Sequence, residues 1–343
     1  MAEYAHLSVP DLEIAEEMRA LAQLPKPPDY PTIREILRNV VTPEIVRLLG
    51  PELPSELEYE INDYMINVAD GSGTQVLARN IIPRKKTPDE SFPLLFWTHG
   101  GGWSAGHADL DDPFLKILCA KLRISVVNCE YRLAPEHPFP TGLNDCYAVL
   151  KHVAGNMTQF SASLRKGFIV AGASSGANFS AVLALRARDD PFFEGKPLTG
   201  QLLLVPSVIH KDAYSELPEE FRSRLLSLEQ NANAPGFGIC DLNMSNSSYK
   251  APPLDPYVSP LLASSHKGLP PVFIQVAGFD PLRDDGFLYE KVLKDNGVST
   301  RLIAYPGVPH GILYSFPQTK VGKKFRKDLE GGLQWLLNFS SQE

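Results

Sequence analysis

A serine between two glycines is the residue of this sequence most clearly suited to chemistry. The pentad at 172–176 reads Gly-Ala-Ser-Ser-Gly, and it stands between an apolar run at 168–171 and a helix-like stretch at 177–187. A serine at such a strand–turn–helix junction is held on a strained turn, and the glycines let the two elements approach closely. The pentad therefore predicts that Ser174 is a nucleophile, against the alternative of a turn that merely contains small residues.

A second glycine-rich stretch, His-Gly-Gly-Gly-Trp at 99–103, follows another apolar run upstream. Consecutive glycines let backbone N–H groups turn toward a carbonyl oxygen that gains negative charge as its carbon becomes tetrahedral. We expect the N–H groups of Gly101, Gly102 and Ser175 to form such an oxyanion hole. We expect the Trp103 side chain to contact substrate. A flexible loop between a strand and a helix is the alternative.

A serine nucleophile of this kind needs a base and an acid, which follow it in the order acid, then histidine. Asp280 comes just after the apolar run 272–277, and His310 is the one histidine of eight that follows Asp280. Two rival acids, Asp284 and Asp285, are better placed to cap the next helix, because carboxylates there accept hydrogen bonds from free N–H groups. The predicted triad is therefore Ser174, Asp280 and His310.

These residues need a framework that brings the ends of several strands together. An antiparallel hairpin at 59–68 and 75–82, with a turn at 70–73, opens the predicted sheet. Short apolar runs that read as buried strands follow at 94–99, 124–131, 167–173, 201–208, 271–277 and 300–305. Helical stretches such as 113–122, 143–153 and 286–295 separate them. This alternation predicts an α/β fold, with a mostly parallel central sheet and helices on both faces.

Two segments do not follow this alternation. Residues 1–55 carry helical stretches at 11–24 and 32–49 before the first strand. Residues 209–250 lie in a connection that is too long for a simple strand-to-helix crossover. We predict that 1–55 and 209–250 are the two segments of a helical cap. Residues 56–208 and 251–343 are then the two parts of one catalytic α/β domain.

Charge and composition limit the partners of this chain. The formal net charge is −7, and no basic cluster is larger than the three residues at 84–86, so a nucleic-acid partner is not expected. A small-molecule ester is the expected partner, and a homodimer is left open. The acidic N-terminus lacks the pattern of a secretory signal, and no apolar stretch is long enough to span a bilayer. The chain has four cysteines, Cys119, Cys129, Cys146 and Cys240. They are too sparse for a disulfide framework, so reduced thiols and a cytoplasmic location are expected.

One group of residues is similar in composition to a metal site. His107, Asp109 and Asp111 lie close together in the sequence. We interpret Asp112 and Pro113 instead as the N-cap and first residue of a helix, with the other three side chains solvated. No metal and no cofactor are therefore expected.

After residue 59 the sequence resembles the hormone-sensitive-lipase family of α/β-hydrolases. The matching stretches are His99–Gly102, Tyr131–Glu136, Gly172–Gly176, Ser259–Leu261, Leu269–Pro271, Asp280–Asp284 and His310-Gly311. The resemblance implies an α/β-hydrolase fold and a carboxylesterase with a helical cap over its site. It also places the family's catalytic aspartate on Asp280 and its histidine on His310.

The chain departs from the family pattern at two places. Ala173 stands where the family often has Asp, which predicts a less charged surrounding for the nucleophile and an altered substrate preference. Ile312 stands where Phe is common, which predicts a wider pocket beside the base. The stretch 131–136 has no chemical role that follows from its residues, and an ion pair between Arg132 and Glu136 is expected to pin its turn.

The expected function is that of a serine carboxylesterase, which hydrolyses a small to medium carboxylic ester through an acyl-enzyme. Two alternatives remain open. One is a biosynthetic acyl hydrolase or acyltransferase that acts on a larger metabolite. The other is a non-catalytic ligand receptor on the same fold, which the presence of all three triad residues argues against. Side chains of the cap would set the acyl length and the alcohol, so neither follows from the sequence.

Overall fold

The computed structural model describes residues 4–68 and 71–340, so Asp70 of the predicted turn lies outside the described part. Its strands are β1 (Tyr59–Asn67), β2 (Gln75–Pro83), β3 (Leu94–Thr98), β4 (Ser125–Cys129), β5 (Phe168–Ala173), β6 (Gly200–Leu204), β7 (Val272–Phe279) and β8 (Thr300–Pro309). They form an eight-stranded sheet in the order β1-β2-β4-β3-β5-β6-β7-β8. β2 is antiparallel to both β1 and β4, and the other neighbouring pairs are parallel. The predicted hairpin and mostly parallel sheet are confirmed.

The α-helices in the described part are α1 (Ala15–Gln23), α2 (Tyr30–Ile36), α3 (Thr42–Leu49), α4 (Ala108–Leu122), α5 (Thr141–Gly155), α6 (Ser175–Asp189), α7 (Glu219–Arg222), α8 (Ser227–Gln230), α9 (Ile239–Tyr249), α10 (Arg283–Asp295), α11 (Ile312–Ser315) and α12 (Lys320–Ser340). A π-helical turn, η2 (Leu37–Val41), joins α2 to α3. Short 3-10 helices are η1 (Ala5–Ser8), η3 (Gly50–Glu52), η4 (Leu164–Lys166), η5 (Pro191–Phe193), η6 (Lys211–Glu216) and η7 (Pro260–Leu262).

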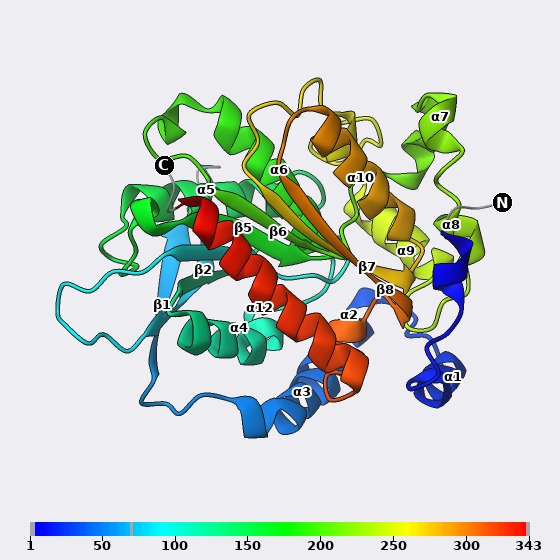
Figure 1. Cartoon of the computed structure of the whole chain (residues 1–343), viewed down its shortest axis with the longest axis horizontal. Coiled ribbons are helices and arrows are strands. Elements are labelled where there is room, and N and C mark those ends of the chain that lie inside the picture. The colour runs from blue at the N-terminus through cyan, green and yellow to red at the C-terminus, as the bar shows by residue number, and fades with distance from the viewer. Residues whose placement is uncertain (1–3, 69–70, 341–343) are drawn as a thin grey trace.

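Side chains of the central strands alternate between two cores, one on each face of the sheet. In β3, Leu94 and Phe96 point into the core shared with α5, α6 and α10. Leu95 and Trp97 point into the core shared with α3, α4 and α12. All four side chains are at most 1% exposed, because a parallel sheet is covered by helices on both faces. Figure 1 shows α12 lying across the sheet on the side that faces the viewer.

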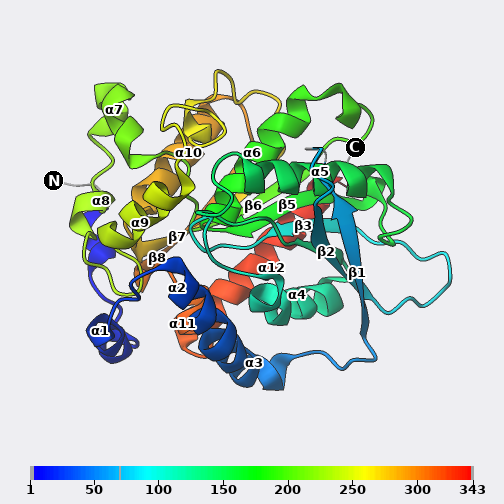
Figure 2. The same cartoon turned by 180° about the vertical axis from the view of Figure 1, so that it is seen from behind.

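The two segments predicted to form a cap contribute helices at one end of the molecule. Helices α7, α8 and α9 of residues 209–250 lie on the same side as α1 and α2, beside β7 and β8 (Figure 2). The segments also touch: the Tyr30 hydroxyl lies 2.9 Å from Ser245 Oγ, and Lys26 Nζ lies 2.7 Å from a carboxylate oxygen of Asp241. The division into cap and catalytic parts stays a prediction.

Two local predictions are wrong. Helix α4 begins at Ala108, so Pro113 lies inside the helix and Asp112 does not cap it. The Asp112 carboxylate instead accepts a hydrogen bond from Arg79 Nη1 at 2.7 Å. Among the described residues, Arg132 forms no ion pair with Glu136. Its Nη2 instead donates to the buried Asp145 of α5 at 2.6 Å.

All four cysteines are free, in agreement with the predicted reduced thiols, and Cys119, Cys129 and Cys146 are buried in α4, β4 and α5. Over the described residues, no helix combines the length and the apolar character needed to cross a membrane. The cytoplasmic location stays a prediction.

Candidate active site

Ser174 stands on a sharp turn between β5 and α6. Its backbone has φ 55° and ψ −117°, a strained conformation for a residue with a side chain. Its N–H donates to the Leu204 carbonyl of the neighbouring strand at 2.8 Å, which holds the turn against the sheet. A Cβ on Gly172 would lie 2.5 Å from the Thr98 carbonyl oxygen, and one on Gly176 would overlap the same atom. The glycines are therefore required for the close approach of the turn to β3.

His310 and Asp280 come from the loops that follow β8 and β7. His310 Nε2 lies 2.8 Å from Ser174 Oγ, and His310 Nδ1 lies 2.7 Å from Asp280 Oδ2. A carboxylate can only accept, so the Nδ1–H donates to Asp280, and Nε2 is left to accept the Ser174 proton. Asp280 is 1% exposed, and its Oδ1 accepts the Leu282 N–H at 2.8 Å. The structure thus brings the three predicted residues into one hydrogen-bonded chain.

The two rival acids have other partners. Asp284 Oδ2 accepts the N–H groups of Leu226 and Ser227 at 2.9 and 2.8 Å. Asp285 accepts the Tyr214 hydroxyl at 2.7 Å, and burial raises the pKa of its carboxyl well above the usual range. Within the described part of the chain, neither carboxylate accepts a hydrogen bond from a backbone N–H of α10, so the prediction that they cap this helix is wrong. Instead they attach residues 209–250 to α10.

The glycine-rich loop after β3 passes beside the nucleophile. A Cβ on Gly100 would lie 3.6 Å from Ser174 Cβ. Gly101 and Gly102 have φ angles of 121° and 60°, which glycine tolerates best. Within residues 4–68 and 71–340, neither of their N–H groups has a hydrogen-bond acceptor. Ser175 is the first residue of α6, where a backbone N–H has no partner inside the helix. These three N–H groups are therefore available to an oxyanion.

Buried residues next to the glycine-rich loop hold its backbone in place by hydrogen bonds. The Tyr131 hydroxyl donates to the His99 carbonyl at 2.9 Å, and its ring stacks on the His99 imidazole with centroids 4.3 Å apart. Burial lowers the pKa of His99 to about 4, so the ring is neutral. Its Nδ1–H then donates to the Gly100 carbonyl at 2.9 Å. The Ala134 N–H donates to the Trp103 carbonyl at 3.0 Å. The stretch 131–136 thus supports the glycine-rich loop, a role that its residue types did not indicate.

Arg34, in the N-terminal segment 1–55, also holds the glycine-rich loop in place. Arg34 Nε donates to the Ser104 carbonyl at 2.8 Å, and Arg34 Nη2 donates to the Ala134 carbonyl at 2.7 Å. The same guanidinium forms an ion pair with Glu136 at 2.7 Å, so the expected Arg132–Glu136 pair is replaced by this one. Sequence patterns give no sign of these contacts, because Arg34 is far from its partners along the chain.

Trp103 lies at the end of the glycine-rich loop and is 4% exposed. Its indole stacks on Tyr249 of α9, with centroids 4.6 Å apart and planes 4° from parallel. The predicted contact with substrate therefore stays a prediction, and the contact that the structure shows is with residues 209–250.

A phenyl ring that the sequence did not single out lies on the histidine. Phe237 stacks on His310 with ring centroids 4.3 Å apart and an interplanar angle of 24°. Ile312 does not line a space beside the base, because it is 1% exposed and packs in the core with α12. The expected widening at this position is therefore wrong. Ala173 is likewise buried, at 3% exposure.

The prediction that His107, Asp109 and Asp111 are solvated is wrong for two of these three side chains. His107 is 4% exposed and Asp111 is fully buried, whereas Asp109 is exposed and pairs with Arg79. Among the residues described, no group of three or more His, Cys, Asp and Glu side chains could hold a metal ion.

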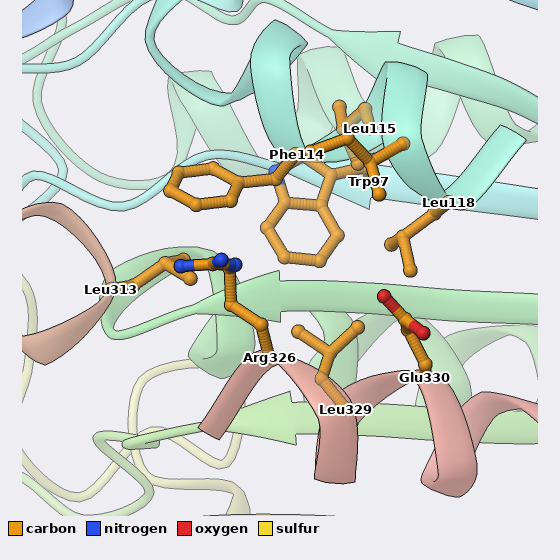
Figure 3. A pocket seen from close by; sticks show the side chains of 9 residues that line it. Trp97, Phe114, Leu115, Leu118, Leu313, Arg326, Leu329 and Glu330 are labelled. Atoms are coloured by element: carbon orange, nitrogen blue, oxygen red, sulfur yellow. The ribbon is translucent and has the colours of Figure 1, made fainter. Parts of the chain in front are cut away.

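A small cavity lies away from the triad, between α4 and α12 (Figure 3). Its volume is about 20 Å³, enough for roughly one water molecule. Phe114, Leu118 and Leu329 contribute apolar walls, and the guanidinium of Arg326 is paired with Glu52 at 2.6 Å. None of its lining residues belongs to the triad, so we interpret it as a packing gap.

Comparisons with known proteins agree with this geometry. The family model described as alpha/beta hydrolase fold matches residues 95–314, more than half of the chain. An AB hydrolase superfamily protein of Schizosaccharomyces pombe is 37% identical over 85% of this chain and 84% of its own length. The versiconal hemiacetal acetate esterase of Dothistroma septosporum is 31% identical over 87% of this chain and 89% of its own length.

Solved structures show the same relationship. The crystal structure of vibralactone cyclase superposes with a TM-score of 0.91 and 40% identity, covering 98% of this chain and 97% of that one. Other matches carry the names carboxylesterase and esterase. The chain therefore belongs to the α/β-hydrolases of the hormone-sensitive-lipase type and is a carboxylic ester hydrolase.

Proposed function

We propose that Ser174, Asp280 and His310 are a catalytic triad with which this chain hydrolyses small to medium carboxylic esters through an acyl-enzyme. The observation that supports this most directly is the continuous hydrogen-bonded chain from Ser174 Oγ through both imidazole nitrogens to the buried Asp280 carboxylate. The strained backbone of Ser174 adds to this support, since strain of this kind concentrates at reactive positions.

The first half of the reaction forms the acyl-enzyme. Ser174 Oγ attacks the ester carbonyl while His310 Nε2 takes its proton, and Asp280 stabilises the imidazolium. The carbonyl oxygen becomes an oxyanion that accepts hydrogen bonds from the N–H groups of Gly101 and Gly102, together with that of the residue after the nucleophile. His310 then gives its proton to the departing alcohol oxygen, and the ester C–O bond breaks.

The second half releases the acid. Water attacks the acyl carbon while His310 accepts one of its protons, and the C–O bond to Ser174 breaks as the serine regains a proton. The carboxylic acid then leaves. Apart from the ester and this water molecule, the two halves use only groups of the chain.

Ser174→Ala tests this proposal, with Ser175→Ala as a matched control. Turnover of a short-chain nitrophenyl ester should fall by several orders of magnitude, and on the order of a million-fold in kcat is seen when such a nucleophile is removed. Ser175→Ala keeps the backbone N–H that the oxyanion needs, so its kcat should change less than about tenfold.

A fluorophosphonate probe gives an independent readout for the same pair of variants. The wild type and Ser175→Ala should each take up one phosphonyl group on Ser174, and Ser174→Ala none. Full turnover or labelling in Ser174→Ala would refute the proposal.

A second candidate is acyl transfer to a hydroxyl group of a larger metabolite, or within one. The similarity to vibralactone cyclase favours it, because that protein's name describes ring formation rather than hydrolysis. The esterase of Dothistroma septosporum is instead named for the cleavage of an acetate ester. Product analysis with a competing alcohol decides: a new ester would indicate transfer, and acid alone would indicate hydrolysis. The receptor alternative loses support, because the relatives are named as enzymes.

The proposal includes the cap. Residues 1–55 and 209–250 would cover the triad, since side chains from both segments reach the glycine-rich loop. A Cβ on Gly102 would overlap Ser245 Oγ and lie 3.3 Å from the Tyr30 hydroxyl.

Dimerisation stays a prediction that analytical ultracentrifugation would check.

A further inference from the structure

Phe237 is the side chain of residues 209–250 that stacks on the imidazole of His310. The two ring centroids lie 4.3 Å apart, and the ring planes are 24° from parallel. Phe237 is half-buried. Gly236, directly before it, has φ 79°, a conformation that turns the chain sharply and suits glycine. The loop therefore presents the ring to the histidine by way of a tight turn.

The loop that carries Phe237 is fixed at both ends. Before it, the buried Asn231 donates from Nδ2 to the Asp280 carbonyl at 2.9 Å. After it, the Ile239 N–H donates to the Ala232 carbonyl at 2.8 Å, which closes the loop on itself. Phe237 is thus anchored to the same backbone that carries Asp280, and its ring forms a wall rather than a free tip.

The chemistry of ester cleavage says which part of a substrate this wall meets. The His310 Nε2 proton goes to the oxygen of the departing alcohol, so that oxygen must come within about 3 Å of Nε2. The carbonyl oxygen instead faces the N–H groups of Gly101 and Gly102. A ring stacked on the imidazole therefore borders the alcohol portion of the ester.

We propose that Phe237 determines specificity on the alcohol side: it excludes alcohol portions that branch at the carbon bound to the ester oxygen and admits unbranched ones. This inference rests on the proposed function, because it needs His310 as the proton donor to the alcohol. Branching places a methyl group beside Nε2, where the Phe237 ring already covers the imidazole. Acyl length is set elsewhere, since the acyl chain leaves the carbonyl carbon away from the histidine.

Two ester series with the Phe237→Ala variant test the proposal. The first keeps the acetyl group and changes the alcohol from ethyl to isopropyl to tert-butyl. The second keeps the ethyl group and lengthens the acyl chain from two to eight carbons. Phe221→Ala is the matched control, because Phe221 is another half-buried aromatic residue of residues 209–250.

In Phe237→Ala, kcat/KM for isopropyl acetate relative to ethyl acetate should rise at least about tenfold, the scale on which pockets discriminate single carbon groups. The acyl-length profile should stay within about threefold of the wild type, and Phe221→Ala should leave both ratios unchanged. An unchanged alcohol ratio, or equal shifts in both series, would overturn the proposal.

A second variant keeps the test decisive if Phe237→Ala does not fold. Phe237→Leu retains an apolar side chain and should move the alcohol ratio in the same direction by a smaller factor. Active-site titration with a fluorophosphonate normalises each variant to correctly folded enzyme. A wild type that hydrolyses no ester and takes up no probe refutes the proposed function. An active wild type whose alcohol ratio neither Phe237 variant shifts refutes only this inference.

Discussion

Asp111 carries a carboxylate that the reaction does not use but that lies close to the loop of the histidine. It is fully buried in α4, and its oxygens accept from the Trp97 Nε1–H at 2.7 Å and from the Tyr314 hydroxyl at 2.9 Å. Burial raises the pKa of Asp111 to about 6, and the charge of Asp112 adds to the rise. Tyr314 lies in α11, directly after the His310 loop. The Asp111 carboxylate therefore holds α11, the helix that follows His310. The free-energy cost of burying this carboxylate depends on pH.

The sign of that cost follows from where the proton is held. Between about pH 4 and pH 6 the folded chain keeps a proton on Asp111 that the unfolded chain has lost, so this group lowers stability as pH rises through that window. Asp111→Asn removes the titration and keeps the shape. Its free energy of unfolding relative to wild type should therefore increase between pH 4 and pH 7 by up to about 3 kcal/mol.

Urea unfolding at several pH values measures this difference. Asp109→Asn is the control, because Asp109 is an exposed residue of the same helix whose pKa is lowered: partial burial raises it, but the hydrogen bond with Arg79 and the nearby positive charges together outweigh that burial. Its difference from wild type should stay flat between pH 5 and pH 7. A flat difference for Asp111→Asn would contradict the assignment of a raised pKa.

At the scale of elements, α2 positions the glycine-rich loop although it lies far away in the sequence. The Arg34 guanidinium of α2 donates to carbonyl oxygens of Ser104 and Ala134, on two separate turns. The first of these turns follows Gly101 and Gly102 directly. Holding oxyanion donors in place matters, because a displacement of about 1 Å can cost a hundredfold in rate.

Arg34→Met should therefore lower kcat on a nitrophenyl ester by roughly 10- to 100-fold, with little change in KM, because the donors act on the transition state. Glu136→Gln is the matched control. It weakens an ion pair whose acid is half exposed but keeps both backbone hydrogen bonds of Arg34, and such pairs contribute little. Its kcat should stay within about threefold of wild type. Equal losses in the two variants, or a loss in KM alone, would argue against the positioning role.

At the scale of the whole molecule, stability depends on how tightly helices pack on the two faces of the sheet. Helix α12 contacts β6 and β7 along one face. Gly332 is buried there, and a Cβ on it would overlap the Phe273 ring. Gly331, the residue before it, is exposed and has open space around the same position. The helix can approach the sheet closely only because the inner residue has no side chain.

The two glycines of α12 offer a paired prediction. Gly332→Ala should lower the free energy of unfolding by about 1–3 kcal/mol, because an added methyl group overpacks the core. Gly331→Ala should raise it by up to about 1 kcal/mol, because alanine favours a helix and restricts the unfolded chain. Urea unfolding of both variants checks this. Changes of the same sign would show that α12 does not pack as described.

The order of elements could be predicted because it is written in local patterns. Apolar runs of strand length separated by helical stretches define each βα unit, and such units form a parallel sheet with helices on both faces. Boundaries were less accurate: α4 begins at Ala108 and includes Pro113, since tertiary packing overrides a proline near a helix start. The pairing of Arg132 also failed, because Asp145 is closer in space than the acid of its own turn.

The sequence by itself determined the fold class and the residues that meet at the triad. Strands in a parallel sheet end at one edge, so residues that follow β5, β7 and β8 must gather there whatever the cap does. Only the tertiary structure decided what surrounds them. Tyr30 and Ser245 are 215 positions apart yet lie 2.9 Å from each other, and Phe237 reaches His310 from a different segment. Periodicity encodes how each element folds locally, but the partners of an irregular segment depend on where the finished sheet places them.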